Sequence, residues 1–181
     1  IVAGPWGQEM GAKMEEQNIH LVDVWYQGTR QTTSNKPINS MEDMAGLRLR
    51  TPGVPFLIAY AENTGATPAP VAFQEVYLAL QTNQVDAQEN PLPTIEAMKF
   101  YEVQDHIAMT NHFIASAAIQ IGTSTWESLS DLEKEWVEAA ISAGGDKSDA
   151  MTYQDEADLV AVFEERGLTV TMPDTAPFRD A

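Results

Sequence analysis

Apolar residues recur along the chain with two periods, one typical of strands and one typical of helices. The period of two is clearest at residues 47–50, where leucine and arginine alternate; this predicts a half-buried strand whose leucines face the core. The helical spacing is clearest between residues 124 and 166, where Trp126, Leu129 and Leu132 recur along one side. Because strands alternate with helices of about ten residues, the pattern predicts an α/β protein with a largely parallel sheet.

The same pattern predicts the following elements in chain order. Strands are expected at 19–25, 47–50, 68–71, 85–90, 106–109, 113–121 and 168–172. Helices are expected at 9–18, 41–45, 54–63, 73–81, 94–103 and 124–166, the last with a kink or break at Gly144-Gly145. Strand 68–71 is expected at an edge of the sheet because its two prolines cannot donate ladder hydrogen bonds, and residues 173–181 are expected to form a loop.

Composition limits the size of the core and the kinds of partner. The chain has 181 residues and is 44% hydrophobic, which is enough for one sizeable core or for two small lobes that share a connection. It carries 10 Lys+Arg against 27 Asp+Glu, for a formal net charge of -17, and its acidic residues are spread along the chain. This charge repels nucleic acid and anionic membrane surfaces, so neither is expected as a partner.

The sequence contains no cysteine, which excludes disulfides, thiolate metal sites and cysteine nucleophiles. The longest apolar runs are far shorter than the ~20 residues that a membrane helix requires, so no direct membrane insertion is expected. No signal peptide precedes Ile1 in the sequence, and we expect either that one was removed or that the chain is a fragment.

Motifs that would indicate an enzyme are absent from the sequence. The three histidines have no metal-ligand spacing and no nucleophile motif beside them. There is no glycine-rich phosphate loop, no Gly-x-Ser-x-Gly turn and no His-Glu-x-x-His pair. We therefore expect no catalytic residue, no metal site and no cofactor, and we predict that the protein is not an enzyme.

Arginines are few and more informative. Arg50 stands at the carboxyl end of its predicted strand, before a loop that opens a helix, and Arg30 lies where another strand gives way to a loop. Ligands bind at that edge of open α/β sheets, and an arginine there can grip a carboxylate with two hydrogen bonds. Arg48 lies on the same strand face as Arg50, so the spacing alone does not choose between them. A surface role, in which Arg50 only neutralises nearby acids, also remains open.

Two further residues are candidate ligand contacts. Asn90 ends a short predicted strand and could donate to a ligand oxygen, although an asparagine before Pro91 also caps turns. Phe73 opens a predicted helix and could form the wall of a pocket, although an aromatic residue at helical spacing is more often part of the core.

Residues 25–112 resemble the second lobe of the solute receptors of tripartite ATP-independent periplasmic (TRAP) transporters, in the dicarboxylate-receptor branch. The resemblance is carried by several ordered segments, which are WYQGTR at 25–30, GLRLRTP at 46–52, PVAFQEVYLALQ at 70–81, VDAQENP at 85–91, MKFYEVQ at 98–104 and TNH at 110–112. Ala87 departs from the family, in which many members have glycine at this position.

The resemblance implies a two-lobed fold of the periplasmic-binding-protein type that closes about a hinge. This chain would contain the second lobe, part of the first and a long connecting helix. Residues 1–27 would be a remnant of the first lobe and the hinge strand, and 28–112 the second lobe with the carboxylate-binding arginines. Residues 113–181 would supply the return strand, the long bracing helix and the last strand of the first lobe. Family members carry further sequence on both sides of this region.

The resemblance also implies roles for the candidate residues. Arg50 would form a two-pronged salt bridge with the ligand carboxylate, Arg30 would assist it, and Phe73 and Asn90 would line the pocket. The protein would be a periplasmic receptor that hands a small organic acid to the membrane permease subunits of its transporter.

The expected ligand is a C4-dicarboxylate or a related acid. A sugar acid such as a uronate or an aldonate is the alternative within the family, and residues 28–31 do not decide between the two. An enzyme or a sensory domain for organic acids is the more distant alternative.

Overall fold

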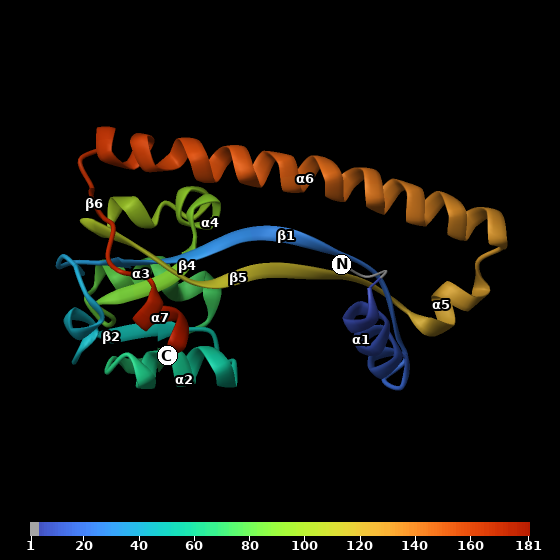
Figure 1. Ribbon diagram of the computed structural model, residues 1–181, viewed down its shortest axis with the longest axis horizontal. Helices are drawn as coiled ribbons and strands as arrows, with labels where there is room; N and C mark the ends of the chain where they lie inside the picture. The colour runs from blue at the N-terminus through green and yellow to red at the C-terminus, as the bar shows by residue number, and fades with distance from the viewer. Residues whose placement is uncertain (1–3) are drawn as a thin grey trace. The chain divides into compact units, whose positions relative to one another are not determined.

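The computed structural model describes residues 4–181, so the first three residues of the predicted segment 1–27 lie outside the described residues (Figure 1). The chain divides into two compact units. Unit 1 comprises Ile1–Gln27 and Ala115–Gln154, and unit 2 comprises Gly28–Ile114 and Asp155–Ala181. Three elements run from one unit into the other, namely β1 (Ile19–Ser34), β5 (His106–Gly122) and α6 (Asp131–Glu165).

The sheet has six strands in the order β3-β2-β4-β1-β5-β6. Its shorter strands are β2 (Arg48–Thr51), β3 (Thr67–Pro70), β4 (Ala87–Pro91) and β6 (Thr169–Thr171). The pairs β2–β3, β2–β4 and β5–β6 are parallel, whereas β1 and β4 are antiparallel. The predicted α/β class is therefore confirmed, and three of these four strand pairs are parallel as expected, whereas the pair of β1 with β4 is not.

Helices connect most of the strands, but the single helix expected at 124–166 is divided into α5 (Thr123–Ser128) and α6. The remaining helices are α1 (Pro5–Glu15), α2 (Pro55–Asn63), α3 (Val76–Gln81), α4 (Leu92–Ala97), α5 (Thr123–Ser128) and α7 (Ala176–Asp180). Short 3₁₀ turns lie at Met41–Met44, Phe73–Glu75 and Phe100–Glu102.

Unit 2 contains two clusters of buried apolar side chains. One gathers residues of α2, β2 and α7, including Leu49, Tyr60 and Phe178. The other gathers residues of α3, α4 and the last part of α6, including Leu80 and Phe163. Figure 1 shows α2 and α4 on opposite sides of the strands between them. The strands of unit 2 are thus held between two apolar layers, and their ends carry the polar residues described below.

Strand β3 is the edge strand that its prolines predict. The backbone N–H of Thr67 donates to the carbonyl of Leu47 at 2.7 Å, so Thr67 faces the neighbouring strand. Because successive residues of a strand point their backbone groups to opposite sides, Pro68 and Pro70 face away from β2.

The structure differs from the predicted elements at β5, at residues 173–181 and in the placement of β6. The two strands expected at 106–109 and 113–121 are one continuous strand, which passes through Asn111 at a positive φ of 46°; asparagine tolerates this conformation better than most residues. Residues 173–181, expected as a loop, contain α7, because Phe178 is buried in the core. Strand β6, expected in the first lobe, pairs with β5 at His106 and belongs to unit 2.

The expected break of the long helix at Gly144-Gly145 is wrong, because α6 continues through both glycines. The two glycines instead make room for the indole of Trp25 within unit 1. A Cβ atom on Gly145 would lie 2.7 Å from Trp25 Nε1, and one on Gly144 would lie 3.3 Å from the same ring. The two glycines therefore allow the Trp25 ring to pack closely against α6, and they do not interrupt the helix.

We expect Gly145→Ala to lower the free energy of unfolding of the full-length protein by about 1–3 kcal/mol, because the added methyl overlaps the Trp25 ring. Gly11→Ala in α1 is the matched control, since a Cβ there meets nothing within 4 Å. It should be neutral or stabilising by about 0.4–1 kcal/mol. Urea unfolding curves measure both effects. Equal stability of the two variants would contradict the close packing of Trp25 against Gly145.

Candidate functional site

Arg50 ends up buried at the carboxyl end of β2, with only 3% of its surface exposed. Its Nε and Nη2 atoms both donate to the backbone carbonyl of Val71, at 3.0 and 2.8 Å. Among residues 4–181, no carboxylate forms an ion pair with this guanidinium. Burial lowers the pKa of Arg50 from its ordinary value, and the charge of Arg30 acts in the same direction while Glu89 opposes it. The site therefore holds a desolvated positive charge without a direct counter-ion.

Arg48 has the opposite environment, although it shares the strand with Arg50. Its side chain is exposed and forms an ion pair with Asp86, with Nε donating to Oδ2 at 2.8 Å. Asp86 Oδ2 also accepts from the backbone N–H of Arg48 at 2.9 Å. The structure thus separates two arginines that the sequence pattern could not, and leaves Arg50 as the candidate for binding an anion.

Arg50 borders an open pocket of about 380 Å³ within unit 2. The pocket is lined by Arg50, Pro52, Gly53, Pro70, Val71, Ala72 and Phe73. The Phe73 ring is 37% exposed, and its centroid lies 5.9 Å from Arg50 Cζ, within the range of a cation–π contact. Phe73 thus lines the same pocket as Arg50, whereas its role as a ligand contact stays a prediction.

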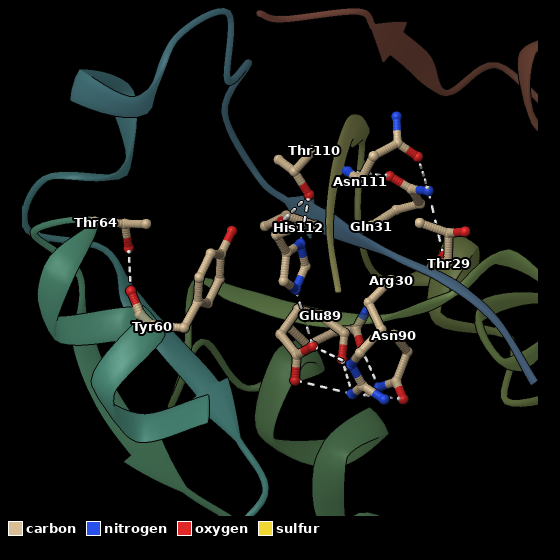
Figure 2. A network of polar contacts seen from close by, with 12 residues as sticks. Thr29, Arg30, Gln31, Tyr60, Thr64, Glu89, Asn90, Thr110, Asn111 and His112 are labelled. Atoms are coloured by element: carbon tan, nitrogen blue, oxygen red, sulfur yellow. Dashed lines mark hydrogen bonds and ion pairs between the residues drawn. The ribbon is translucent and has the colours of Figure 1, made fainter. Parts of the chain in front are cut away.

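Arg30 is not free to act as a second unpaired cation, because it is bound to the buried carboxylate of Glu89 (Figure 2). Arg30 Nε donates to Glu89 Oε2, and Nη2 donates to Glu89 Oε1 at 2.9 Å. The same Nη2 also donates to the Glu89 carbonyl at 2.8 Å and to Asn90 Oδ1 at 3.1 Å. The register explains these contacts, since Gln31 of β1 lies opposite Asn90 of β4.

His112 of β5 holds Glu89 from the other side, as Figure 2 shows. Its Nε2 lies 3.3 Å from Glu89 Oε2, its Nδ1 lies 2.8 Å from Thr110 Oγ1, and its ring stacks on Tyr60 with centroids 4.1 Å apart. Burial lowers the pKa of His112, although the Glu89 carboxylate acts in the opposite direction. A neutral imidazole that donates from Nε2 and accepts at Nδ1 satisfies both neighbours.

The pKa of Glu89 is also lowered, despite complete burial of the residue. Burial alone would raise it, but the hydrogen bonds from His112 and Arg30 and the charge of Arg30 outweigh that effect. Glu89 is therefore a carboxylate at neutral pH and compensates the charge of Arg30.

All four predicted site residues lie in unit 2, but they form two separate groups. Arg50 and Phe73 border the open pocket, whereas Arg30 and Asn90 belong to the network around Glu89. Sequence reasoning missed Glu89 and His112. One signal was present in the sequence: Glu89 is an acidic residue between Gln88 and Asn90 in the short strand expected at 85–90.

Other candidate sites are weaker in the described part of the chain. No group of three or more His, Asp or Glu residues there could hold a metal ion. No helix between residues 4 and 181 is long and apolar enough to cross a membrane. A pocket of about 320 Å³ beside α1 is lined by Trp6, Met10, Met14 and neighbouring residues, and it lacks a guanidinium.

Comparison with known proteins identifies a family of solute-binding proteins. The family model described as bacterial extracellular solute-binding protein, family 7, matches residues 1–181. The sialic acid-binding periplasmic protein SiaP of Vibrio cholerae is 49% identical over 168 residues, which are 93% of this chain and 52% of that protein. The C4-dicarboxylate-binding periplasmic protein DctP of the same organism is 34% identical over 68% of this chain and 37% of its own length.

A solved structure is also similar along almost the whole chain. It is a TRAP periplasmic solute-binding protein from Roseobacter denitrificans with bound 3-deoxy-D-manno-oct-2-ulosonic acid. The two chains superpose with a TM-score of 0.94 and 33% identity, covering 98% of this chain and 60% of that one. This chain thus spans about half the length of the curated relatives that it matches.

The buried histidine generates a pH prediction. Because the pKa of His112 lies below its ordinary value of 6.5 in the folded protein, the unfolded chain takes up a proton first as the pH falls. The contribution of neutral His112 to the free energy of unfolding is therefore complete above pH 6.5. It is lost as the pH falls from 6.5 toward the pKa of His112 in the folded protein. His112→Phe keeps a ring against Tyr60 but cannot titrate, so its stability should depend less on pH. Urea unfolding at about pH 7.5 and about pH 5.5 measures the free energy of unfolding of both proteins. An equal change in this free energy between the two pH values for both proteins would contradict the prediction.

Proposed function

This chain belongs to family 7 of the bacterial extracellular solute-binding proteins, and we propose that it acts as the periplasmic receptor of a TRAP transporter. In this role it binds a small organic acid and delivers it to the membrane permease subunits. The observation that carries the proposal is Arg50, a buried guanidinium beside an open pocket with no carboxylate partner among residues 4–181.

The geometry of Arg50 supports binding of a carboxylate by two hydrogen bonds. Its Nε and one N–H of Nη2 are used by Val71, which leaves the edge formed by Nη1 and Nη2. That edge matches the spacing of two carboxylate oxygens. An anion at this edge would compensate a charge whose burial is otherwise unfavourable.

We propose that the ligand is a sugar acid, which is the alternative to the C4-dicarboxylate expected from the sequence. In unit 2, the charge of Arg30 is already compensated by Glu89, so one uncompensated guanidinium remains for one carboxylate. Two relatives support this assignment, namely the sialic acid-binding protein at 49% identity and the solved structure with a bound octulosonic acid. Binding of a C4-dicarboxylate stays a prediction, supported by the dicarboxylate-binding relative at 34% identity.

The remaining structural assignments follow from the same proposal. Unit 2 corresponds to the second lobe, which carries Arg50, and unit 1 contains the part of the first lobe that this chain supplies. The function is binding rather than catalysis, in keeping with relatives that are solute-binding proteins.

Substitution of Arg50 tests the proposed carboxylate clamp. Arg50→Lys keeps the charge but cannot present two parallel N–H groups, and we expect ligand affinity to fall by about 10- to 100-fold. Arg50→Ala should abolish binding. Arg48→Lys, on the exposed arginine of the same strand, is the matched control and should bind as the unchanged protein does. Titration calorimetry of the full-length protein measures all three, and unchanged affinity in Arg50→Lys would reject the clamp.

A ligand panel tests the class of acid. We expect sialic acid or 3-deoxy-D-manno-oct-2-ulosonic acid to raise the melting temperature of the full-length protein by mass action, and succinate to leave it unchanged. A shift with succinate and none with the sugar acids would favour a dicarboxylate receptor. No shift with any organic acid would overturn the proposed function.

A further inference from the structure

A chain of buried polar side chains runs through unit 2 from Asn90 to a backbone carbonyl. Asn90 Nδ2 donates to Gln88 Oε1 at 2.6 Å, and Gln88 Nε2 donates to Thr33 Oγ1 at 3.0 Å. Thr33 Oγ1 donates to Gln104 Oε1 at 3.0 Å, and Gln104 Nε2 donates to the carbonyl of Val103 at 3.1 Å. We call Gln88, Thr33 and Gln104 the relay.

The relay has one direction only, because both of its ends are fixed. The Val103 carbonyl can only accept, so Gln104 must turn its NH₂ group toward it and its oxygen toward Thr33. The hydroxyl of Thr33 then gives its proton to Gln104, and its oxygen accepts from Gln88. The oxygen of Gln88 is left to accept from Asn90 Nδ2.

At the other end, the guanidinium of Arg30 can only donate. It donates from Nη2 to Asn90 Oδ1 at 3.1 Å, which requires the same orientation of the Asn90 amide that the relay imposes. Turning any one amide of the chain around would place two donors or two acceptors face to face in a buried site, which costs more than losing the hydrogen bond alone.

We propose that the relay positions Asn90 and Arg30 for ligand binding, an inference that rests on the proposed function. The relay is remote from solvent, since Gln88 and Thr33 are 0% exposed and Gln104 is 2% exposed. It locks Oδ1 of Asn90 on Arg30 and one N–H of Nδ2 on Gln88, so the second N–H of Nδ2 is the group left for a ligand oxygen. Gln88, Thr33 and Gln104 are therefore positioning residues that act through Asn90.

Packing alone does not account for this chain of polar groups. Apolar residues fill nearby buried positions, such as Ala87 beside Gln88 on β4 and Ile107 on β5, and an apolar core of equal shape can be as stable as a satisfied polar one. A fully hydrogen-bonded polar network instead specifies one arrangement of its members. The relay thus gives Asn90 and Arg30 one fixed geometry before the ligand arrives, which reduces the ordering that binding requires.

Thr33→Val tests the relay, because it keeps the shape of the side chain and removes the hydroxyl at the centre of the chain. We expect the affinity of the full-length protein for its best-binding acid to fall by about tenfold, mainly through faster dissociation. Thr33→Ser restores the hydroxyl and should restore affinity to within about threefold. Thr64→Val is the matched control, since the buried Thr64 hydroxyl bonds only to the carbonyls of Tyr60 and Ala61, outside the relay.

A second measurement needs no ligand and separates positioning from general destabilisation. The side-chain NH₂ group of Asn90 should rotate more slowly than that of an exposed asparagine, as followed by NMR exchange between its two N–H signals. Thr33→Val should accelerate this rotation, whereas Thr64→Val should not. Should Thr33→Val fail to fold, Gln104→Met, which removes the last amide of the relay, should accelerate the rotation in the same way.

The outcomes distinguish the two proposals. If the unchanged protein binds an acid and Thr33→Val binds it as tightly as Thr64→Val does, the relay has no positioning role. If no acid binds, the proposed function is lost, and the relay is then judged by the rotation of the Asn90 amide alone. Equal rotation rates in Thr33→Val and Thr64→Val would overturn it.

Discussion

The desolvated charge of Arg50 is the constraint on which the rest of the site depends. A guanidinium buried at the end of β2 loses most of its hydration, and within residues 4–181 only the Val71 carbonyl accepts hydrogen bonds from it. The surrounding residues hold the side chain still but do not neutralise it, and burial lowers its pKa accordingly. Unit 2 thus holds an uncompensated positive charge beside an open pocket, and an anionic ligand would compensate this charge.

The second arginine shows how the same residue type acquires a different role from its neighbours. Arg30 is compensated by Glu89, which is held in turn by His112. Its charge therefore adds little net potential, but its guanidinium is fixed in position by acceptors on β4. One arginine supplies uncompensated charge, and the other supplies directed N–H groups in a rigid frame. Under the proposed function, a site built in this way would select a ligand by its number of charges as well as by its shape.

Local features of the fold were predictable from the sequence, and contacts between distant residues were not. Leucine–arginine alternation predicted β2 and placed Arg50 at its end, and the two prolines predicted an edge strand. The ion pair of Arg30 with Glu89 joins residues 59 positions apart, so no local pattern reveals it. The packing of Trp25 against Gly145 of α6 likewise joins residues that are far apart in the sequence. The resemblance of residues 25–112 to a known family indicated the candidate residues, but not which arginine would already be paired.

The arrangement of β3 has a consequence for solubility. Thr67 bonds toward β2, so Pro68 and Pro70 occupy the positions where a further strand would seek backbone N–H groups. The outer rim of the sheet therefore offers few donors to a second copy of the chain. A sheet margin of this kind is a poor template for the growth of intermolecular β-structure.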